Sequence, residues 1–453
     1  MTISESTYHD LASQVVKRLT KNNTEIEVYY QINNKLQISI EQSTIKSERE
    51  EVTQGFSFRV AKGKKIGRSY SNTPDLSKME ETCVNAIQIA NKSPVDKYWS
   101  GLPSSSFLKS VKGIFDTEFA GITPKSAIEM ISTSIEPIKI IEKQNGCKIS
   151  SQGQLIFNTE LEGIVNSNGI DRQEKRTKAL FYLSGNCKKN DEVSGGIWDA
   201  IFTRNLAVWT FDKLKSFGHV LGEKIINNLG SQPIPSLMGQ IILHPDVVTQ
   251  LCEQTLIPAL SAEQIHAKRS PLADKIGYKE FESVVDISDD GTIPHGLNSC
   301  SFDGEGVGRK GKTQLINHGI IKSYLYDHYH ANIFNAENTA NSKRQVYSSS
   351  PRIYSTNLII TSHGNKMLKD IISDTEKGAL IGGFSGNCNF ENGEFSGVCK
   401  NSFLIKNGEK QFPLKDTTIS GNFYDVLSKG EYSKDRKITF RGIEAPALIY
   451  NYD

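Results

Sequence analysis

The chain has 453 residues, too many for a single ordinary core, so its length predicts two or three domains. Lys and Arg total 53 against 51 Asp and Glu, a balance that argues against nucleic acid or an anionic membrane surface as a partner. No basic segment precedes an apolar core near Met1, and no run of about eighteen apolar residues occurs, so we expect a cytoplasmic protein without a membrane span.

The first part of the chain combines helical and strand patterns. Periodic apolar residues predict helices over four stretches: 4–21, 76–91, 124–145 and 211–229. Between residues 25 and 72 the alternation of apolar and polar residues predicts a meander of three or four antiparallel strands, with turns at Asn33-Asn34 and at 62–65. A further hairpin is expected to close at 166–169, whose sequence is NSNG.

The Gly/Pro-rich stretch 230–235 is the expected main boundary. It separates an α+β N-terminal domain, 1–230, from a β-rich C-terminal domain, 231–453. A single amphipathic helix is predicted for 244–263, because its apolar residues recur at spacings of three and four. After it the patterns are mostly those of strands, with an INHG turn at 316–319.

The seven cysteines are scattered and odd in number, without a CxxC pair. This distribution argues against a disulfide framework and against a zinc ribbon. We therefore expect most of them to be buried, reduced thiols.

The order of segments in the second half resembles the TldD/PmbA family. The resemblance is carried by SPLADKIG at 270–277, the long glycine-rich segment 289–327 and STNLII at 355–360. Near the end, FLIKNGEKQFP and DTTISGNFYDVL, within 403–427, are similar to the family's C-terminal signature. The resemblance implies an α+β protein with an antiparallel meander, a β-rich C-terminal domain and a deep cleft formed on dimerisation.

In the family's TldD-like branch, the equivalent of helix 244–263 carries a HExxxH zinc motif. Here the resemblance places Glu253 and Pro258 at the two histidine positions and Gln254 at the catalytic glutamate; no HExxxH occurs anywhere. The family's third ligand resembles a late cysteine, and this chain has none after Cys399. We therefore expect no catalytic residue and no metal in this chain, which is similar to the TldE/PmbA-like branch.

Two weaker candidates for a metal site also have simple structural interpretations. Cys252 beside Glu253 is more simply a buried thiol next to a surface carboxylate. His328 and His330 would share one face if they lay in a strand, and His295 or Asp327 would have to complete such a metal site. The alternative is a polar strand end that binds nothing.

The segment FDGEGVGRKGK, 302–312, superficially suggests a phosphate cradle. It lacks the GxxxxGK[ST] order and the strand-then-helix context, so we favour a role in backbone conformation. The resemblance implies that this stretch shapes the groove beside the active cleft, with Asp303, Glu305 and Gly306 as substrate-binding candidates. No GxSxG sequence supports a serine hydrolase.

The resulting hypothesis is a non-catalytic subunit of a zinc metalloprotease complex that processes unfolded peptides. Its partner would be a TldD-like catalytic subunit that holds the zinc. Two alternatives remain open: a stand-alone metal-dependent hydrolase with a relocated site, and a homodimeric peptide-binding module. Whether the chain is itself an enzyme is not decided by its sequence.

Overall fold

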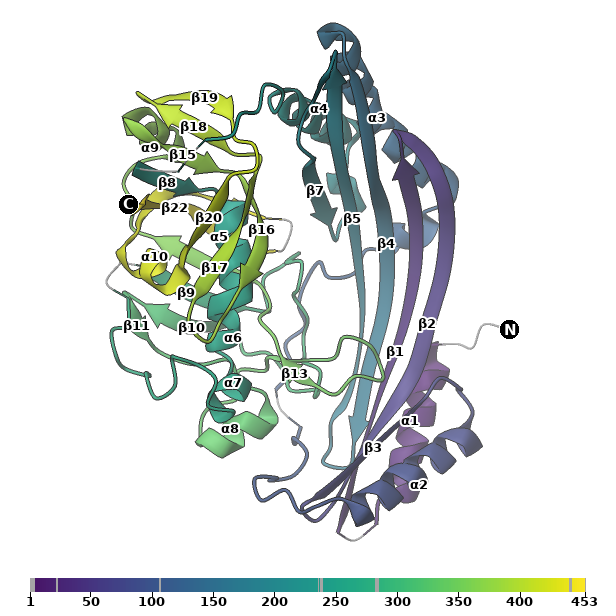
Figure 1. The fold of residues 1–453 in the computed structure, drawn as a ribbon. Helices are drawn as coiled ribbons and strands as arrows, with labels where there is room; N and C mark the ends of the chain where they lie inside the picture. Colours follow the sequence, from purple (N-terminus) through teal and green to yellow (C-terminus); the bar gives the residue numbers. More distant parts are fainter. Residues whose placement is uncertain are drawn as a thin grey trace.

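The structure is a computed structural model, which describes residues 5–21, 23–105, 107–234, 236, 239–281, 285–439 and 442–452. Figure 1 shows two bodies side by side, a long curved sheet with helices along it and a more compact β-rich body. The α+β fold class is confirmed. The exact place of a domain boundary at 230 stays a prediction.

The N-terminal body consists of these elements in chain order: α1 (Glu5–Leu19), β1 (Thr24–Glu41), β2 (Thr44–Lys62), β3 (Lys65–Ser71), α2 (Leu76–Lys92), η1 (Thr117–Gly121), α3 (Pro124–Asn145), β4 (Lys148–Asn166), β5 (Asp171–Lys189), β6 (Glu192–Val193), β7 (Ile197–Thr203), η2 (Leu206–Val208) and α4 (Phe211–Ile226). The four predicted helices are all present, with ends shifted by up to three residues.

The strands of this body form an antiparallel sheet in the order β3-β2-β1-β4-β5-β6, with β7 also paired to β5. The predicted turn at Asn33-Asn34 is wrong. Both residues lie in the middle of β1, where they pair with β2 on one side and β4 on the other. The chain reverses instead at Gln42 and Ser43, which both have positive φ. Backbone pairing with β2 on one side and β4 on the other outweighs the preference of two asparagines for a turn.

The long strands have two different faces. Even-numbered residues of β1, such as Ile26, Val28 and Ile38, pack under the helices: α1 and α2 cover one part and α3 and α4 the other. Odd-numbered residues, such as Glu27 and Tyr29, point to the opposite face, because side chains alternate along a strand. That second face meets loops of the C-terminal body.

The C-terminal body consists of these elements: β8 (Gly239–Leu243), α5 (Pro245–Leu251), the π-helical turn η3 (Cys252–Leu256), α6 (Ile257–Ala259), α7 (Ala262–His266), β9 (Val285–Asp290), β10 (Lys312–Asn317), β11 (Ile320–Ile321), α8 (His328–Phe334), β12 (Ser342–Lys343), β13 (Arg352–Ile353), β14 (Leu358–Ser362), α9 (Leu368–Asp374), β15 (Lys377–Ile381), β16 (Gly383–Cys388), β17 (Glu394–Lys400), β18 (Phe403–Lys406), β19 (Glu409–Pro413), β20 (Thr418–Asn422), α10 (Phe423–Lys429), β21 (Glu431–Ile438) and β22 (Glu444–Tyr452).

Its main sheet has the order β11-β10-β9-β14-β22-β8-β15-β18-β19, and a smaller sheet has the order β16-β17-β20. Helix α5 contacts β22 and β8 of the main sheet and β16 of the smaller one, so it lies between the two sheets. This position explains why Val247, Val248 and Leu251 are completely buried. Among the described residues, no helix is long and apolar enough to cross a membrane.

Candidate functional site

The helix that begins at Pro245 is capped by His244, whose side chain accepts a hydrogen bond from the backbone N–H of Asp246. Proline suits the first helical position, and an aspartate in the first turn favours the positive end of the helix dipole. The helix ends at Ala259, earlier than the predicted Glu263. The reason lies outside the helix: the backbones of Leu260 and Ala262 pair with Leu325, which turns the chain away.

Between α5 and α6 the helix widens into a π-helical turn over Cys252–Leu256, where the N–H of Ile257 donates to the carbonyl of Cys252. Pro258 follows immediately. A proline inside an α-helix has no N–H to donate, and its ring collides with the carbonyl four residues earlier. A wider turn relieves that collision, and such turns occur mostly as single insertions in α-helices, often at functional sites.

The π-helical turn changes which side chains share a face. Residues five apart lie about 140° around the axis of a regular α-helix, but a helix with bonds from i to i+5 brings them toward one side. Glu253 and Pro258, which the family resemblance places at the two histidine positions of a HExxxH motif, have this spacing. The backbone geometry that such a motif needs is therefore present, while its donor atoms are not.

The residues at these positions do not fit zinc. Pro258 has no ligand atom, and the amide of Gln254 cannot act as a general base. Cys252 is completely buried, and burial raises the pKa of its thiol well above the ordinary range. No cysteine or histidine occurs in 428–453, the segment that would have to supply a late ligand.

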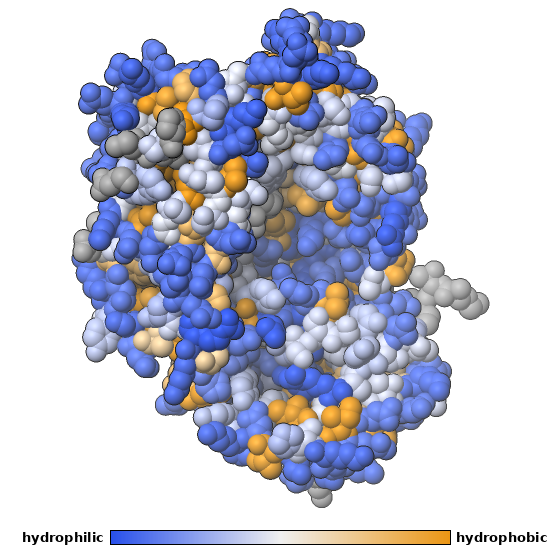
Figure 2. Space-filling view, viewed as in Figure 1, coloured by the Kyte–Doolittle hydropathy of each residue, from blue (hydrophilic) through white to orange (hydrophobic). Residues whose placement is uncertain are grey.

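A groove of about 670 Å³ opens beside the start of this helix, at the junction of the two bodies; we call it the junction groove. One wall is β7 with α4, and the other includes the start of α5 together with β15 and β16. Figure 2 shows the surface hollowed between the two bodies, with polar and apolar side chains around the recess.

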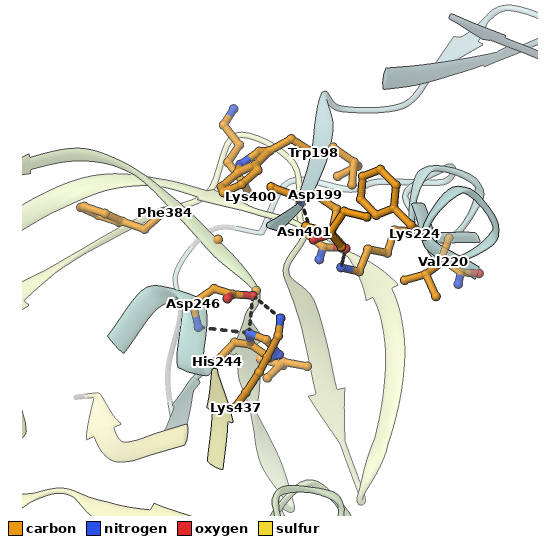
Figure 3. A pocket seen from close by; sticks show the side chains of 18 of the residues that line it. Trp198, Asp199, Val220, Lys224, His244, Asp246, Phe384, Lys400, Asn401 and Lys437 are labelled. Atoms are coloured by element: carbon orange, nitrogen blue, oxygen red, sulfur yellow. Dashed lines mark hydrogen bonds and ion pairs between the residues drawn. The ribbon is translucent and has the colours of Figure 1, made fainter. Parts of the chain in front are cut away.

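Charged side chains on both walls point into the junction groove (Figure 3). On the C-terminal wall, Asp246 accepts a hydrogen bond from Lys437 at 2.9 Å and lies 3.1 Å from His244 Nδ1. Burial opposes ionisation of Asp246, but His244 and Lys437 outweigh it and hold its pKa well below the ordinary value. On the opposite wall, Lys224 donates to Asp199 at 2.5 Å.

β7 presents an edge to this groove. Within the described residues β7 pairs only with β5, and every residue from Ile197 to Phe202 lines the groove. A strand with one unpaired side exposes a row of N–H and C=O groups that an extended peptide can join.

A second hollow, of about 360 Å³, lies deeper between the long sheet and the loops of the C-terminal body. Asp303 lines it and is itself held in place. The backbone N–H groups of Glu305, Val307 and Ser342 all donate to the Asp303 carboxylate. Burial and the neighbouring charge of Glu305 raise the pKa of Asp303 to about 7.

The other two substrate-binding candidates are enclosed. Glu305 is 1% exposed; it accepts hydrogen bonds from Arg59 of β2 at 2.7 Å and from the backbone N–H of His328 at 2.9 Å. Gly306 has φ +79°, and a Cβ there would lie 2.5 Å from Ile170 Cγ2. Both residues therefore join the two bodies; their role toward a substrate stays a prediction.

The prediction that His328 and His330 lie in a strand is wrong. They begin helix α8, where Asp327 caps the helix by accepting from the N–H of His330. Two residues apart on a helix, their side chains point in different directions. His330 is buried and pairs with Asp327 at 2.7 Å, and His328 lies 3.3 Å from the side-chain nitrogen of Asn332. The face that a shared metal site required is not formed.

Two parts of the chain match models of known protein families. Residues 238–451 match the family described as PmbA/TldA metallopeptidase C-terminal domain, and residues 26–90 match PmbA/TldA metallopeptidase domain 1. The chain belongs to the TldD/PmbA family of metalloproteases.

Members of both TldD/PmbA branches align with most of the chain. It is 22% identical to a metalloprotease TldD homolog of Haemophilus influenzae, over 92% of this chain and 86% of that protein. It is also 22% identical to a metalloprotease PmbA homolog of Buchnera aphidicola, over 90% of this chain and 88% of that one. The crystal structure of TldE from Thermococcus kodakarensis has the same fold, with a TM-score of 0.85, 24% identity and 98% of each chain covered. The chain is equally identical to the TldD homolog and to the PmbA homolog, so overall sequence identity does not show which branch of the family it belongs to.

Several residues of the site were not found from the sequence. Lys437 lies almost 200 positions from Asp246, and Arg59 lies 246 positions from Glu305. No local motif connects such pairs. The usable signal in the sequence is a charge between two apolar residues of a strand, as at Glu27 and Arg59, because a charge within a buried strand requires a partner.

Proposed function

We propose that this chain is the non-catalytic, TldE/PmbA-like subunit of a zinc metalloprotease complex that processes unfolded peptides. The observation that carries the proposal is the π-helical turn in α5–α6, which provides the spacing of a HExxxH motif but holds Glu253, Gln254 and Pro258. A TldD-like partner would supply the zinc and the reacting groups.

The part of this chain, in the proposal, is to hold the substrate. An unfolded peptide offers backbone N–H and C=O groups whatever its sequence, and the side of β7 that faces away from β5 offers matching groups inside the junction groove. The N–H of Ala200, which donates to Asp199 Oδ1 at 2.8 Å, would exchange that bond for one to the peptide. Adding a strand to a sheet edge is therefore a sequence-tolerant way to bind it. Lys224 and Lys437 are paired with Asp199 and Asp246. The groove lining also holds Lys213, Lys400 and Lys410, so it carries an excess of positive charge.

The test is reconstitution with a TldD-like chain from the same source. Cleavage of casein is measured for this chain alone, for the partner alone and for the mixture, with a partner whose motif glutamate is changed to glutamine as control. We expect chelator-sensitive cleavage only when the intact partner is present, and faster cleavage in the mixture. Cleavage by this chain alone would contradict the proposal. A stable homodimer that does not bind the TldD-like chain would favour the homodimeric peptide-binding module instead.

A substitution in β7 tests the role of the strand edge. Proline at Ala200, in the middle of β7, removes a backbone N–H that donates to Asp199 Oδ1, and it disfavours pairing with an added strand. Proline at Val193, in the short β6 that also pairs with β5, is the matched control, because it lies outside the groove lining. We expect the Ala200→Pro mixture to show a raised KM for casein with the complex intact. An unchanged KM would exclude this edge as the peptide site.

A further inference from the structure

Three side chains with metal-binding atoms meet at one end of the main C-terminal sheet. Asp286 is on β9, His318 is in the turn between β10 and β11, and His363 follows β14. β10 and β14 are the two neighbours of β9 in the sheet, so the three residues come from three adjacent strands.

The register of the strands explains why they meet. Ile316 of β10 lies opposite Ile287, and Thr361 of β14 lies opposite Asp286. Both neighbours run antiparallel to β9, so each histidine, two residues further on, lies beside the beginning of β9. The convergence is therefore a property of the sheet and not of long, flexible loops.

Each imidazole lies from one oxygen of Asp286 at a distance that is long for a hydrogen bond and equal to the distance between two ligands of one metal ion. His318 Nδ1 lies 3.3 Å from Asp286 Oδ1, and His363 Nε2 lies 3.4 Å from Asp286 Oδ2. Charge-assisted hydrogen bonds between such groups are about 2.7–2.9 Å long. Ligands at about 2.0–2.1 Å from a tetrahedral zinc ion are roughly 3.3–3.4 Å apart. One ligand atom from each residue can be chosen so that all lie within 4.8 Å of one another.

His330 and Asp327 provide a comparison within the same chain. His330 Nδ1 lies 2.7 Å from Asp327 Oδ1, as expected for an imidazole and a carboxylate that interact directly. At Asp286 neither histidine lies this close, although both imidazoles are about half exposed. His318 Nδ1 is nearer to Asn317 Oδ1, at 3.2 Å, and His363 contacts Asp286 at 3.4 Å. Contacts of this length are weak enough to be exchanged for bonds to an ion.

The carboxylate is oriented before any ion binds. Asp286 Oδ1 accepts a hydrogen bond from the backbone N–H of His318 at 2.7 Å, which fixes the turn against β9. His318 has φ +49° and the following Gly319 has φ +77°, so the turn is tight. Such hydrogen bonds to a ligand reduce the freedom that is lost when the metal binds.

We propose that Asp286, His318 and His363 form a binding site for a divalent transition-metal ion, and that zinc is the ion this donor set suits best. Two imidazoles and one carboxylate fill three positions and leave at least one for water or for a donor from another molecule. The site uses none of the motif positions on α5–α6, so it is independent of the proposed peptidase role. It revises the expectation that this chain binds no metal.

Isothermal titration of chelator-treated full-length chain with zinc chloride at pH 7.5 tests the site. His318→Asn keeps a residue that tolerates positive φ, and His363→Gln and Asp286→Asn preserve side-chain size. His219→Gln is the control, since His219 is an exposed histidine on α4, far from this sheet in sequence and fold.

We expect one zinc per chain in the wild type and in His219→Gln, at least about tenfold weaker binding in each single site variant, and loss of that binding in His318→Asn/His363→Gln. Cobalt(II) in place of zinc should give the absorption of a low-symmetry site, lost in the same variants. Binding should also weaken toward pH 5, because an imidazole must be deprotonated to bind. Unchanged binding in the double variant, or no binding by folded wild-type protein, would overturn the proposal. Casein cleavage in the reconstituted complex is a separate readout, so either proposal can fail without the other.

Discussion

Asp246 shows how one residue at the start of a helix takes its properties from distant parts of the chain. The helix dipole favours a carboxylate at this position, and His244 and Lys437 hold it from either side. The side chain is 24% exposed, so most of its hydration is lost and its partners replace it. Because its pKa is lower in the folded state than in the unfolded state, the ionised carboxylate stabilises the folded protein.

We predict that Asp246→Asn lowers the free energy of unfolding by about 1 kcal/mol at pH 7 and by less at pH 3. Because the folded-state pKa lies well below the unfolded one, the contribution is complete above about pH 4, begins to fall below that pH, and is lost fully only as the pH falls through the folded-state pKa. Urea unfolding at both pH values measures this. Asp212→Asn, in the first turn of α4, is the control for the helix dipole alone. Equal costs at both pH values would contradict the prediction.

Introducing the HExxxH residues at 253–258 tests whether α5–α6 can still form a metal site. We predict that Glu253→His, Gln254→Glu and Pro258→His together create neither tight zinc binding at this helix nor peptidase activity. The backbone spacing is present, but a third ligand is missing and no second shell orients the new imidazoles. The triple variant is titrated with zinc in the His318→Asn/His363→Gln background and assayed on casein. Tight stoichiometric binding with turnover would show that the pocket is intact.

At the scale of elements, the glycine-rich loop 302–312 is a connector. Gly306 lies against Ile164 and Ile170, at the β4–β5 hairpin of the other body, and its backbone has positive φ. The sequence predicted a backbone role for these glycines, and the structure shows where the close approach occurs.

We predict that Gly306→Ala lowers the free energy of unfolding by more than Gly277→Ala does, by an additional 1–3 kcal/mol or so. Both glycines have positive φ, +79° and +89°, so both variants carry a similar backbone strain. Only at Gly306 would the new methyl group collide with a packed side chain, whereas nothing lies within 4 Å of a Cβ at Gly277. Denaturant unfolding measures both, and equal losses would mean that Ile170 moves aside without cost.

At the scale of the whole molecule, buried charges join the two bodies. Glu27 of β1 accepts from Arg59 at 2.5 Å and from Arg344 of the C-terminal body at 2.5 Å, while Arg59 also donates to Glu305. All four side chains are at most 3% exposed. Removing the charge of Glu305 leaves Arg59 and Arg344 to share the carboxylate of Glu27, so the buried cluster then carries a net positive charge away from water.

We predict that Glu305→Gln lowers the free energy of unfolding by about 3–5 kcal/mol and makes unfolding less cooperative, because the two bodies are then held together less firmly. Glu337→Gln removes the acid of the exposed Lys310–Glu337 pair and should cost less than about 1 kcal/mol. Calorimetry of both variants checks the size and the shape of the transition. A single sharp transition with a small loss for Glu305→Gln would contradict the prediction.

The sequence by itself determined most of the elements that local patterns control. Helices α1 to α4 follow from apolar spacing, and the hairpin turns at Gly169 and Gly319 follow from residues that accept positive φ. The family resemblance, and with it the fold class, rested on contiguous segments and is confirmed. These features depend on neighbours a few positions apart, which a sequence shows directly.

Tertiary structure decided the rest. Asn33 and Asn34 stay extended because strands pair with them on both sides, and His330 is in a helix because Asp327 caps it. The partners of Asp246 and the convergence of Asp286 with His318 depend on which strands are neighbours in a sheet. Such contacts join residues tens to hundreds of positions apart, and their free energies appear only when folding brings the groups together. No local pattern in the sequence records them.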